Sequence, residues 1–314
     1  MDKLTDKPKL ADVALETRKD LYPPIDQVGM GNIEVPVLLA SDQGSLFRVP
    51  ARVNAKVSLD RASSRGIHMS RLYLSVQEML SSKALNYALL EELSQEFLKT
   101  HKDLSRHAYL AVKFEAPLQR KALKSENKAW RTYPVTLSVE NFEGRPKILA
   151  EVLVTYSSTC PASAALSRQL IQDHFKKEFL SQDELNFEDI HQWLGSSEGV
   201  IATPHAQRSE ARVKVQLQSS SSAFSFEDLI DVVEDALQTP VQGAVKREDE
   251  QEFALRNGQN LMFCEDASRR IKAALDRVPD VADYLIEVKH LESLHPHNAE
   301  ALITKGVNNG LRSY

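Results

Sequence analysis

Cysteine and glycine are both scarce in this chain, which has 314 residues, 2 of them cysteines and 11 of them glycines. Two thiols in a chain of this length do not make a disulfide framework, so the expected compartment is the reducing cytoplasm. The glycines form neither a Walker loop nor a Gly-x-Gly-x-x-Gly fingerprint, so a Gly-rich phosphate cradle is not indicated. The sequence also lacks CxxC, HExxH and GxSxG patterns.

Long apolar runs are missing as well. No run approaches the roughly 20 apolar residues that a membrane helix needs. Residues 1–20 are mostly polar and charged and contain no apolar h-region, so we expect no signal peptide. The net charge of −5 argues against general affinity for nucleic acid or for membranes. We expect neither as a partner, and an anionic ligand would need a local basic cluster.

The composition that remains is that of a soluble globular protein, with 42% hydrophobic and 26% charged residues. This length accommodates one large or two ordinary domains. Alternating apolar and polar residues predict half-buried strands, most cleanly from Ala51 to Leu59. The expected strands lie at 34–39, 51–59, 108–114, 133–139, 148–156, 211–217 and 281–290.

Apolar residues at helical spacing predict helices between these strands. The expected helices lie at 85–97, in two pieces within 165–203, at 225–237, from 248 to 257 and at 262–275. Ser225 with Asp228 predicts a cap for one helix. Ser181 with Glu184 resembles a capping box for the second piece of 165–203, which is expected to end near Leu194. Residues 60–72 are expected to form an ordered loop.

Strands, a helix and then more strands indicate an α+β fold rather than strict βαβ alternation. We expect an extended N-terminal arm at 1–30, a first module at 31–160, a helical insertion at 161–203 and a second, similar module at 204–314. The modules would join near Cys160. No sequence repeat marks the two modules.

Cys160 and His205 are the first two residues with candidate chemistry. Cys160 follows a strand and precedes a proline, so it is either a buried apolar cysteine or a thiolate that binds metal or attacks a substrate. His205 precedes a clean strand, where a histidine is usually a surface or hydrogen-bonded residue. Together they would supply two ligands, one short of the three protein ligands typical of a catalytic metal.

The carboxylates of Glu250 and Glu265, further along the chain, each have a structural and a functional interpretation. Glu250 is expected in the first turn of a helix, where it either stabilises the helix terminus or supplies a third ligand, and Glu248 and Asp249 compete for that role. Glu265 is either a solvated charge or the acceptor for the adjacent N1–H and N2–H donors of guanine. Cys264 beside it is interpreted as a packing residue.

The pair His295 and His297 straddles a proline, which is typical of a loop, yet imidazoles also suit proton transfer or metal binding. The basic residues nearest to the other candidates are Arg71, Arg208, Lys246 and Arg247. A triphosphate would need such a cluster.

Six short pieces of the sequence, taken in chain order, resemble those of the type IB GTP cyclohydrolases. The resemblance runs from about Val28 onward. The matching pieces are Gly66-Ile67-His68-Met69-Ser70-Arg71, Ser158-Thr159-Cys160-Pro161, His205-Ala206-Gln207-Arg208-Ser209, Lys246-Arg247-Glu248-Asp249-Glu250, Phe263-Cys264-Glu265-Asp266 and Glu292-Ser293-Leu294-His295-Pro296-His297-Asn298-Ala299. Six pieces in the family's order are specific, although each is weak alone.

The resemblance implies two tandem tunnelling-fold modules, with antiparallel sheets and helices on one face, assembled as a homotetramer with sites near interfaces. Cys160, His205 and Glu250 would hold one divalent metal ion, Mn²⁺, Zn²⁺ or Fe²⁺. Cys160, His295 and His297 would be catalytic, with His295 favoured over His297 for metal binding or proton transfer. Glu265 would anchor guanine. The basic residues proposed to bind substrate with it are Arg71, Arg208 and Lys246.

The activity implied is metal-dependent hydrolysis of GTP at guanine C8, with release of formate and formation of 7,8-dihydroneopterin triphosphate, the first step of tetrahydrofolate biosynthesis. Two departures stand out. Ala162 replaces the second cysteine of the family's usual Cys-Pro-Cys-Ser, and residues 165–203 lengthen a link that is usually short. The alternatives are another tunnelling-fold enzyme that acts on a pterin or deazapurine, and a non-catalytic purine-binding homologue.

Overall fold

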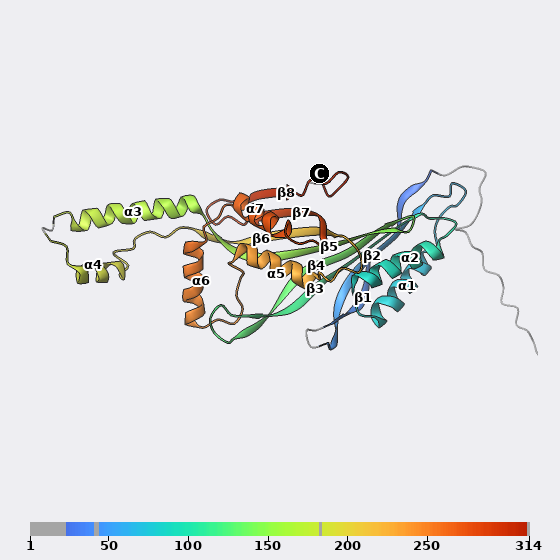
Figure 1. Ribbon diagram of the computed structural model, residues 1–314, viewed down its shortest axis with the longest axis horizontal. Helices are drawn as coiled ribbons and strands as arrows, with labels where there is room; N and C mark the ends of the chain where they lie inside the picture. Colours follow the sequence, from blue (N-terminus) through green and yellow to red (C-terminus); the bar gives the residue numbers. More distant parts are fainter. Residues whose placement is uncertain (1–22, 41–43, 182–183, 313–314) are drawn as a thin grey trace, which may run out of the picture. The chain divides into compact units, whose positions relative to one another are not determined.

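The computed structural model describes residues 23–40, 44–181 and 184–312 (Figure 1). Its strands are β1 (Ile25–Ala40), β2 (Leu46–Leu59), β3 (His107–Lys121), β4 (Lys128–Phe142), β5 (Arg145–Thr159), β6 (Ala206–Leu217), β7 (Val281–His290) and β8 (Ala299–Thr304). Its helices are α1 (Met69–Ser82), α2 (Tyr87–Thr100), α3 (Pro161–Phe179), α4 (Phe187–Leu194), α5 (Phe226–Leu237), α6 (Arg247–Gln259) and α7 (Cys264–Leu275).

The strands form a sheet in which each strand is hydrogen-bonded to the next one along the chain. The pairs β1–β2, β2–β3 and β7–β8 are antiparallel. The alternation in β2 is observed as predicted, since the side chains from Ala51 to Leu59 that were expected to face inward are all buried. The α+β class with antiparallel strands is therefore confirmed.

The chain divides into two compact units. Unit 1 comprises Met1–Ala116, Val135–Ala150 and Gln216–Ala223, and unit 2 comprises Pro117–Pro134, Glu151–Val215 and Phe224–Tyr314. In chain order, two strands, two helices and two strands run from β1 to β4, and the order from β5 to β8 is similar except that α3 and α4 lie between β5 and β6. The domain boundaries expected from the sequence remain a prediction. Of the arm expected at 1–30, residues 1–22 lie outside the described residues, whereas residues 25–30 are already part of β1.

Unit 1 contains a helix that was not predicted from the sequence. Residues 60–72 were expected to be a loop, but α1 begins at Met69 and packs against β1. Its buried residues Leu72, Val76 and Leu80 are spaced four apart, so they share one face. The following helix α2 was predicted, and its Asn86 side chain accepts the backbone N–H of Leu89 as an N-cap.

Unit 2 places α5 and α7 against each other and α7 against β7 and β8. The predicted cap of α5 is confirmed, because the Ser225 hydroxyl accepts from the backbone of Asp228 and the Asp228 carboxylate accepts from the backbone of Ser225. Strand β8 was not predicted. Among the described residues, no helix is long and apolar enough to cross a membrane.

The helical segment within 161–203 consists of α3, which continues directly from the end of β5, and α4 beside it (Figure 1). The Trp193 ring of α4 lies edge-on to Phe175 and Phe179 of α3, with ring centroids 5.6 Å apart in each case. The predicted Ser181–Glu184 cap is wrong, because α4 begins at Phe187 and its N-cap is Asn186. Its predicted end near Leu194 is confirmed.

Candidate functional site

Three backbone hydrogen bonds gather the candidate residues of unit 2 at the ends of β5, β6 and β7. The N–H of Cys160 donates to the carbonyl of His205 at 3.3 Å, and the N–H of Met262 donates to the carbonyl of Thr159 at 3.2 Å. On the other side of β6, the N–H of Leu291 donates to the carbonyl of Arg208 at 3.2 Å. Cys160 and His205 therefore lie side by side, close to the start of α7.

Cys160 is the N-cap of α3. Its sulfur accepts the backbone N–H of Ser163 at 3.5 Å, and Pro161 occupies the first helical position, where its missing N–H costs nothing. The side chain is partly exposed, so the alternative of a buried apolar cysteine does not hold, whereas Cys264 is buried as expected. The Ser163 hydroxyl in turn accepts the N–H of His205 at 3.1 Å, which fixes the two candidate ligands to the same turn.

The imidazole of His205 is oriented by Gln207, a residue that was not among the predicted site residues. Its Nδ1 lies 2.9 Å from Oε1 of Gln207, and because an amide oxygen only accepts, this orientation of the amide requires Nδ1 to be the donor and directs Nε2 toward another partner. Glu292 is a second missed residue, with Oε2 3.8 Å from the same Nδ1 and a side chain only 14% exposed. Both residues stand in motifs that resemble the family's, which is the signal that could have found them.

The competition between Asp249 and Glu250 is resolved by their surroundings. Asp249 is fully buried, and its carboxylate accepts the backbone N–H groups of Lys124, Ser125 and Lys246 at 2.8 Å each. Burial alone would raise the pKa of Asp249, but the hydrogen bonds outweigh it and hold the pKa well below its usual range. Asp249 is therefore structural, and Glu250 is exposed on the first turn of α6.

Glu250 is the predicted ligand that the chain does not bring to Cys160. Helix α6 touches the end of β5 through Asn257, whose Oδ1 accepts the hydroxyl of Ser157 at 2.7 Å. Glu250 lies about two helical turns before that contact. Within residues 23–40, 44–181 and 184–312, no group of three His, Cys, Asp or Glu side chains is placed to hold a metal ion.

The donor chemistry of the pair nevertheless fits a divalent metal. A sulfur that accepts a backbone N–H and an imidazole that bonds to Gln207 through Nδ1 are both suitable ligands. The partner at Nδ1 of His205 is the outer hydrogen bond that metal-binding histidines usually make. Glu250 as third ligand remains a prediction.

Glu265 and Asp266 differ in the same way as Glu250 and Asp249, since one carboxylate is exposed and the other has a structural role. Asp266 accepts the backbone N–H of Phe263 at 3.0 Å and so caps α7. Glu265 is exposed, and its own backbone N–H, followed by the thiol of Cys264, holds its pKa below the usual value. Burial raises the pKa of Cys264 to about 11, so at neutral pH the thiol is protonated and donates to Glu265 Oε2 at 3.3 Å.

The remaining candidates lie on the surface. His295 and His297 are exposed in the connection between β7 and β8, with their rings stacked at 5.0 Å between centroids. Arg208 is exposed on β6, and Lys246 is exposed at the N-cap of α6. Arg71 belongs to unit 1, where its guanidinium donates to the carbonyl of Thr100 at 2.5 Å.

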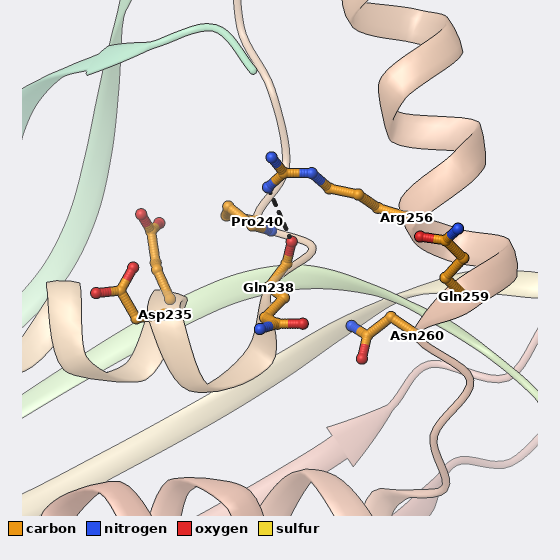
Figure 2. A pocket seen from close by; sticks show the side chains of 7 residues that line it. Asp235, Gln238, Pro240, Arg256, Gln259 and Asn260 are labelled. Carbon is orange, nitrogen blue, oxygen red and sulfur yellow. Dashed lines mark hydrogen bonds between the residues drawn. The ribbon is translucent and has the colours of Figure 1, made fainter. Parts of the chain in front are cut away.

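A cavity of about 580 Å³ in unit 2 lies apart from these residues (Figure 2). It is bounded by the end of α5 and the second half of α6, and Arg256 donates across it to the carbonyl of Gln238 at 3.5 Å. None of the predicted site residues lines it. The cavity is therefore not the predicted site.

Comparison with solved structures shows a fold shared with uricases. The uricase of Arthrobacter globiformis is similar with a TM-score of 0.55 and 9% identity, over 93% of this chain and 97% of that one. The uricase of Bacillus fastidious is similar with a TM-score of 0.51 and 12% identity, over 88% of this chain and 92% of that one. At such low identity the likeness shows the fold alone, which is the tunnelling fold expected above.

Comparison of sequences finds much closer relatives. A protein of Bdellovibrio bacteriovorus named GTP cyclohydrolase FolE2 is 61% identical over 98% of this chain and 99% of its own length. A protein of the same name from Hydrogenovibrio crunogenus is 46% identical over 96% of each chain.

Both alignments run along nearly the whole of each protein, so relative to these two proteins the segment 165–203 is not an addition to the chain. The expectation that residues 165–203 lengthen a link that is usually short in the family stays a prediction. Because the model of the type I GTP cyclohydrolase folE2 family also matches residues 10–301, the chain belongs to that family.

Proposed function

We propose that this protein hydrolyses GTP at guanine C8, releases formate and forms 7,8-dihydroneopterin triphosphate, the first step of tetrahydrofolate biosynthesis. One observation carries the proposal. Cys160 and His205 are hydrogen-bonded neighbours, and Thr159 at the adjoining strand end is bonded to Met262, two residues before α7, the helix that carries Glu265. A soft ligand pair and an exposed carboxylate thus adjoin each other in a chain of the GTP cyclohydrolase family.

Glu265 is the residue that would select guanine. Its lowered pKa keeps the carboxylate ionised at neutral pH, and the side chain is exposed at the start of α7. An ionised carboxylate presents two acceptor oxygens, which match the adjacent N1–H and N2–H donors of guanine. Adenine offers no such donor pair, so this contact would discriminate GTP from ATP.

Cys160, His205 and Glu250 would hold the divalent metal, Mn²⁺, Zn²⁺ or Fe²⁺. When bound, such an ion supplies a nucleophile at neutral pH by lowering the pKa of water. The role of the chain is to hold the sulfur and the imidazole adjacent, through the bonds between Cys160, His205 and Ser163. A carboxylate in the set suits harder ions such as manganese.

The exposed imidazoles of His295 and His297 would move protons, with His295 as the group that protonates guanine N7. Arg208 and Lys246 are exposed cations of unit 2 and would bind the triphosphate, and Arg71 of unit 1 stays a further predicted substrate-binding residue. We further propose a cytoplasmic homotetramer with its sites near interfaces, where neighbouring copies complete the set around Cys160.

The decisive experiment uses full-length protein treated with a chelator and then supplied with GTP and Mn²⁺, Zn²⁺ or Fe²⁺ in separate reactions. The expected result is formate release together with a fluorescent pterin for at least one ion. Binding of metal and GTP without either product would contradict the proposal and favour a purine-binding homologue. Product formed from a pterin or deazapurine but not from GTP would indicate a different tunnelling-fold enzyme.

A further inference from the structure

A buried chain of hydrogen bonds begins at His205 and runs beneath the candidate site. Oε1 of Gln207 faces Nδ1 of His205 at 2.9 Å, and the amide nitrogen of the same side chain donates to the hydroxyl of Ser158 at 3.1 Å. The Ser158 and Ser209 hydroxyls lie 2.7 Å apart. Gln207 is only 7% exposed and the two serines are not exposed at all, so water does not provide these bonds.

The chain continues to a second histidine. Ser209 opposes the rise in the pKa of Tyr156 that burial causes, and the Tyr156 hydroxyl lies 2.9 Å from Nε2 of His290. Tyr156 is fully buried and His290 is 2% exposed. Burial lowers the pKa of His290 to about 4, and the nearby charges of Glu265 and Asp266 only partly oppose this, so the ring is neutral at pH 7.

One direction of donation satisfies every member of this array. His205 Nδ1–H donates to Gln207, the Gln207 amide donates to Ser158, and the two serines pass donation on toward Tyr156. Tyr156 then donates to neutral His290. A flipped Gln207 amide would reverse the first bonds and put the His205 proton on Nε2, which removes the lone pair that a metal needs.

Glu292 favours the same tautomer. Its Oε2 lies 3.8 Å from Nδ1 of His205, so a second acceptor stands on the side where Gln207 already accepts. An aliphatic side chain at position 207 would leave both the imidazole N–H and the Ser158 hydroxyl without their buried partner, at a cost to stability. A buried amide between a histidine and two serines therefore serves the orientation of the ring.

We propose that Gln207, Ser158, Ser209 and Tyr156 form a positioning array, anchored at His290, that holds His205 with its Nε2 lone pair open toward a divalent metal. The inference rests on the proposed function in one respect, which is that His205 is a metal ligand. None of these residues is assigned to contact substrate. Their effect is exerted through the imidazole alone.

Gln207 is the residue that tests the array most directly. Affinity for Co²⁺ is measured without GTP by competition with a chelator, and the thiolate-to-cobalt absorption reports the Cys160 contact. Gln207→Leu should weaken Co²⁺ binding by about 10–100-fold, as loss of an outer hydrogen bond to a ligand does. Gln207→Glu should retain the affinity, because a carboxylate still accepts from Nδ1–H. Both are repeated in a Glu292→Leu background, in which residue 292 offers no side-chain acceptor to Nδ1.

Tyrosine variants provide a matched control. Tyr156→Phe removes a buried hydroxyl of the array, whereas Tyr133→Phe removes a buried hydroxyl in unit 2 that bonds instead to Arg120 and Glu234. Only Tyr156→Phe should weaken Co²⁺ binding. In the metal-free protein labelled with ¹⁵N-histidine, the His205 signal should show a protonated Nδ1 and should move toward the other tautomer in Gln207→Leu.

The inference is overturned if Gln207→Leu in the Glu292→Leu background binds Co²⁺ as tightly as the Glu292→Leu variant alone. It is also overturned if a folded Gln207→Glu variant loses affinity as Gln207→Leu does, or if Tyr133→Phe and Tyr156→Phe weaken binding equally. The Co²⁺ measurements contain no GTP, so they test the array separately from turnover. A wild-type protein that binds Co²⁺ in this pattern but does not turn GTP over in a separate assay would refute the proposed function and leave the array intact.

Discussion

The carboxylate of Asp249 accepts the hydroxyl of Ser125 at 2.6 Å, across 124 positions of sequence. The same carboxylate accepts the backbone N–H groups of Ser125 and Lys124, so it fastens the connection between β3 and β4 to the start of α6. Its neighbour Glu250 is exposed. Two adjacent acids therefore have separable roles, one in the fold and one in the proposed metal site.

We expect Asp249→Asn to lower the melting temperature and Glu250→Gln to leave it unchanged, because only Asp249 is buried among donors. Glu250→Gln should instead lower GTP turnover and metal content more than Asp249→Asn does, when both quantities are normalised to the amount of folded protein. Melting curves and metal analysis of both variants provide the measurement. A Glu250→Gln protein with full metal content and normal turnover would remove Glu250 from the ligand set.

The Asp249 contribution should depend on pH with a defined sign. Its pKa is depressed in the folded protein, so its stabilising effect is complete above the unfolded value of about 4 and is lost as the pH falls below it. The difference in melting temperature between the wild-type protein and Asp249→Asn should therefore shrink below about pH 4. A difference that stays constant down to pH 3 would contradict this account.

Cys160→Ser separates the capping role of Cys160 from its proposed ligand role. Serine is a good N-cap, so α3 should retain its start and the melting temperature should not fall. Turnover should drop by at least about 100-fold, because loss of a ligand exceeds the 10–100-fold effect of losing an outer contact. Cys160→Ala is the companion variant that lacks the cap as well. Near-normal formate release by either variant would end the ligand assignment.

Glu265→Gln should reduce the preference for GTP over ATP. The amide offers one acceptor and one donor where guanine needs two acceptors, and a hydrogen bond to a charged group is worth about 1.5–3 kcal/mol. We expect GTP affinity to fall about 10–100-fold, while ATP affinity changes little. Asp266→Asn is the control, since Asp266 caps α7. An unchanged purine preference in Glu265→Gln would exclude this residue from guanine recognition.

His295→Gln and His297→Gln should have unequal effects on kcat. Loss of a general acid or base costs about 10²–10⁴-fold, whereas loss of its stacked neighbour affects only its position. We expect the larger loss in His295→Gln, with KM nearly unchanged in both variants. Steady-state kinetics with GTP measures this. The opposite ranking would transfer the proton-transfer role to His297.

The strands were the most predictable part of the fold, because alternation in the sequence follows directly from burial of one face. The prediction for β7 agrees with its observed span, Val281–His290. Helix α1 was missed because the exposed apolar residues Tyr73 and Leu74 obscure the buried face. Strand β8 was missed because its residues are half-buried or exposed and show no clean alternation.

At the site, sequence reasoning named residues with reactive groups and overlooked those that orient them. Gln207 and Glu292 have no chemistry that distinguishes them in a sequence, and their importance comes from lying 2.9 and 3.8 Å from one ring nitrogen. The ambiguity between Asp249 and Glu250 also required coordinates, since burial decides it. The adjacency of Cys160 and His205 was expected from the resemblance and is observed.

The two hydrogen bonds that His205 makes with Cys160 and Ser163 bring together the start and the end of the segment that contains α3 and α4. Closing a longer loop costs little, about 0.6 kcal/mol for each doubling of its length. The tip of this segment could therefore be trimmed, circularly permuted or fused to a reporter without displacing the sulfur from the imidazole. This makes it the natural attachment point for engineering the protein.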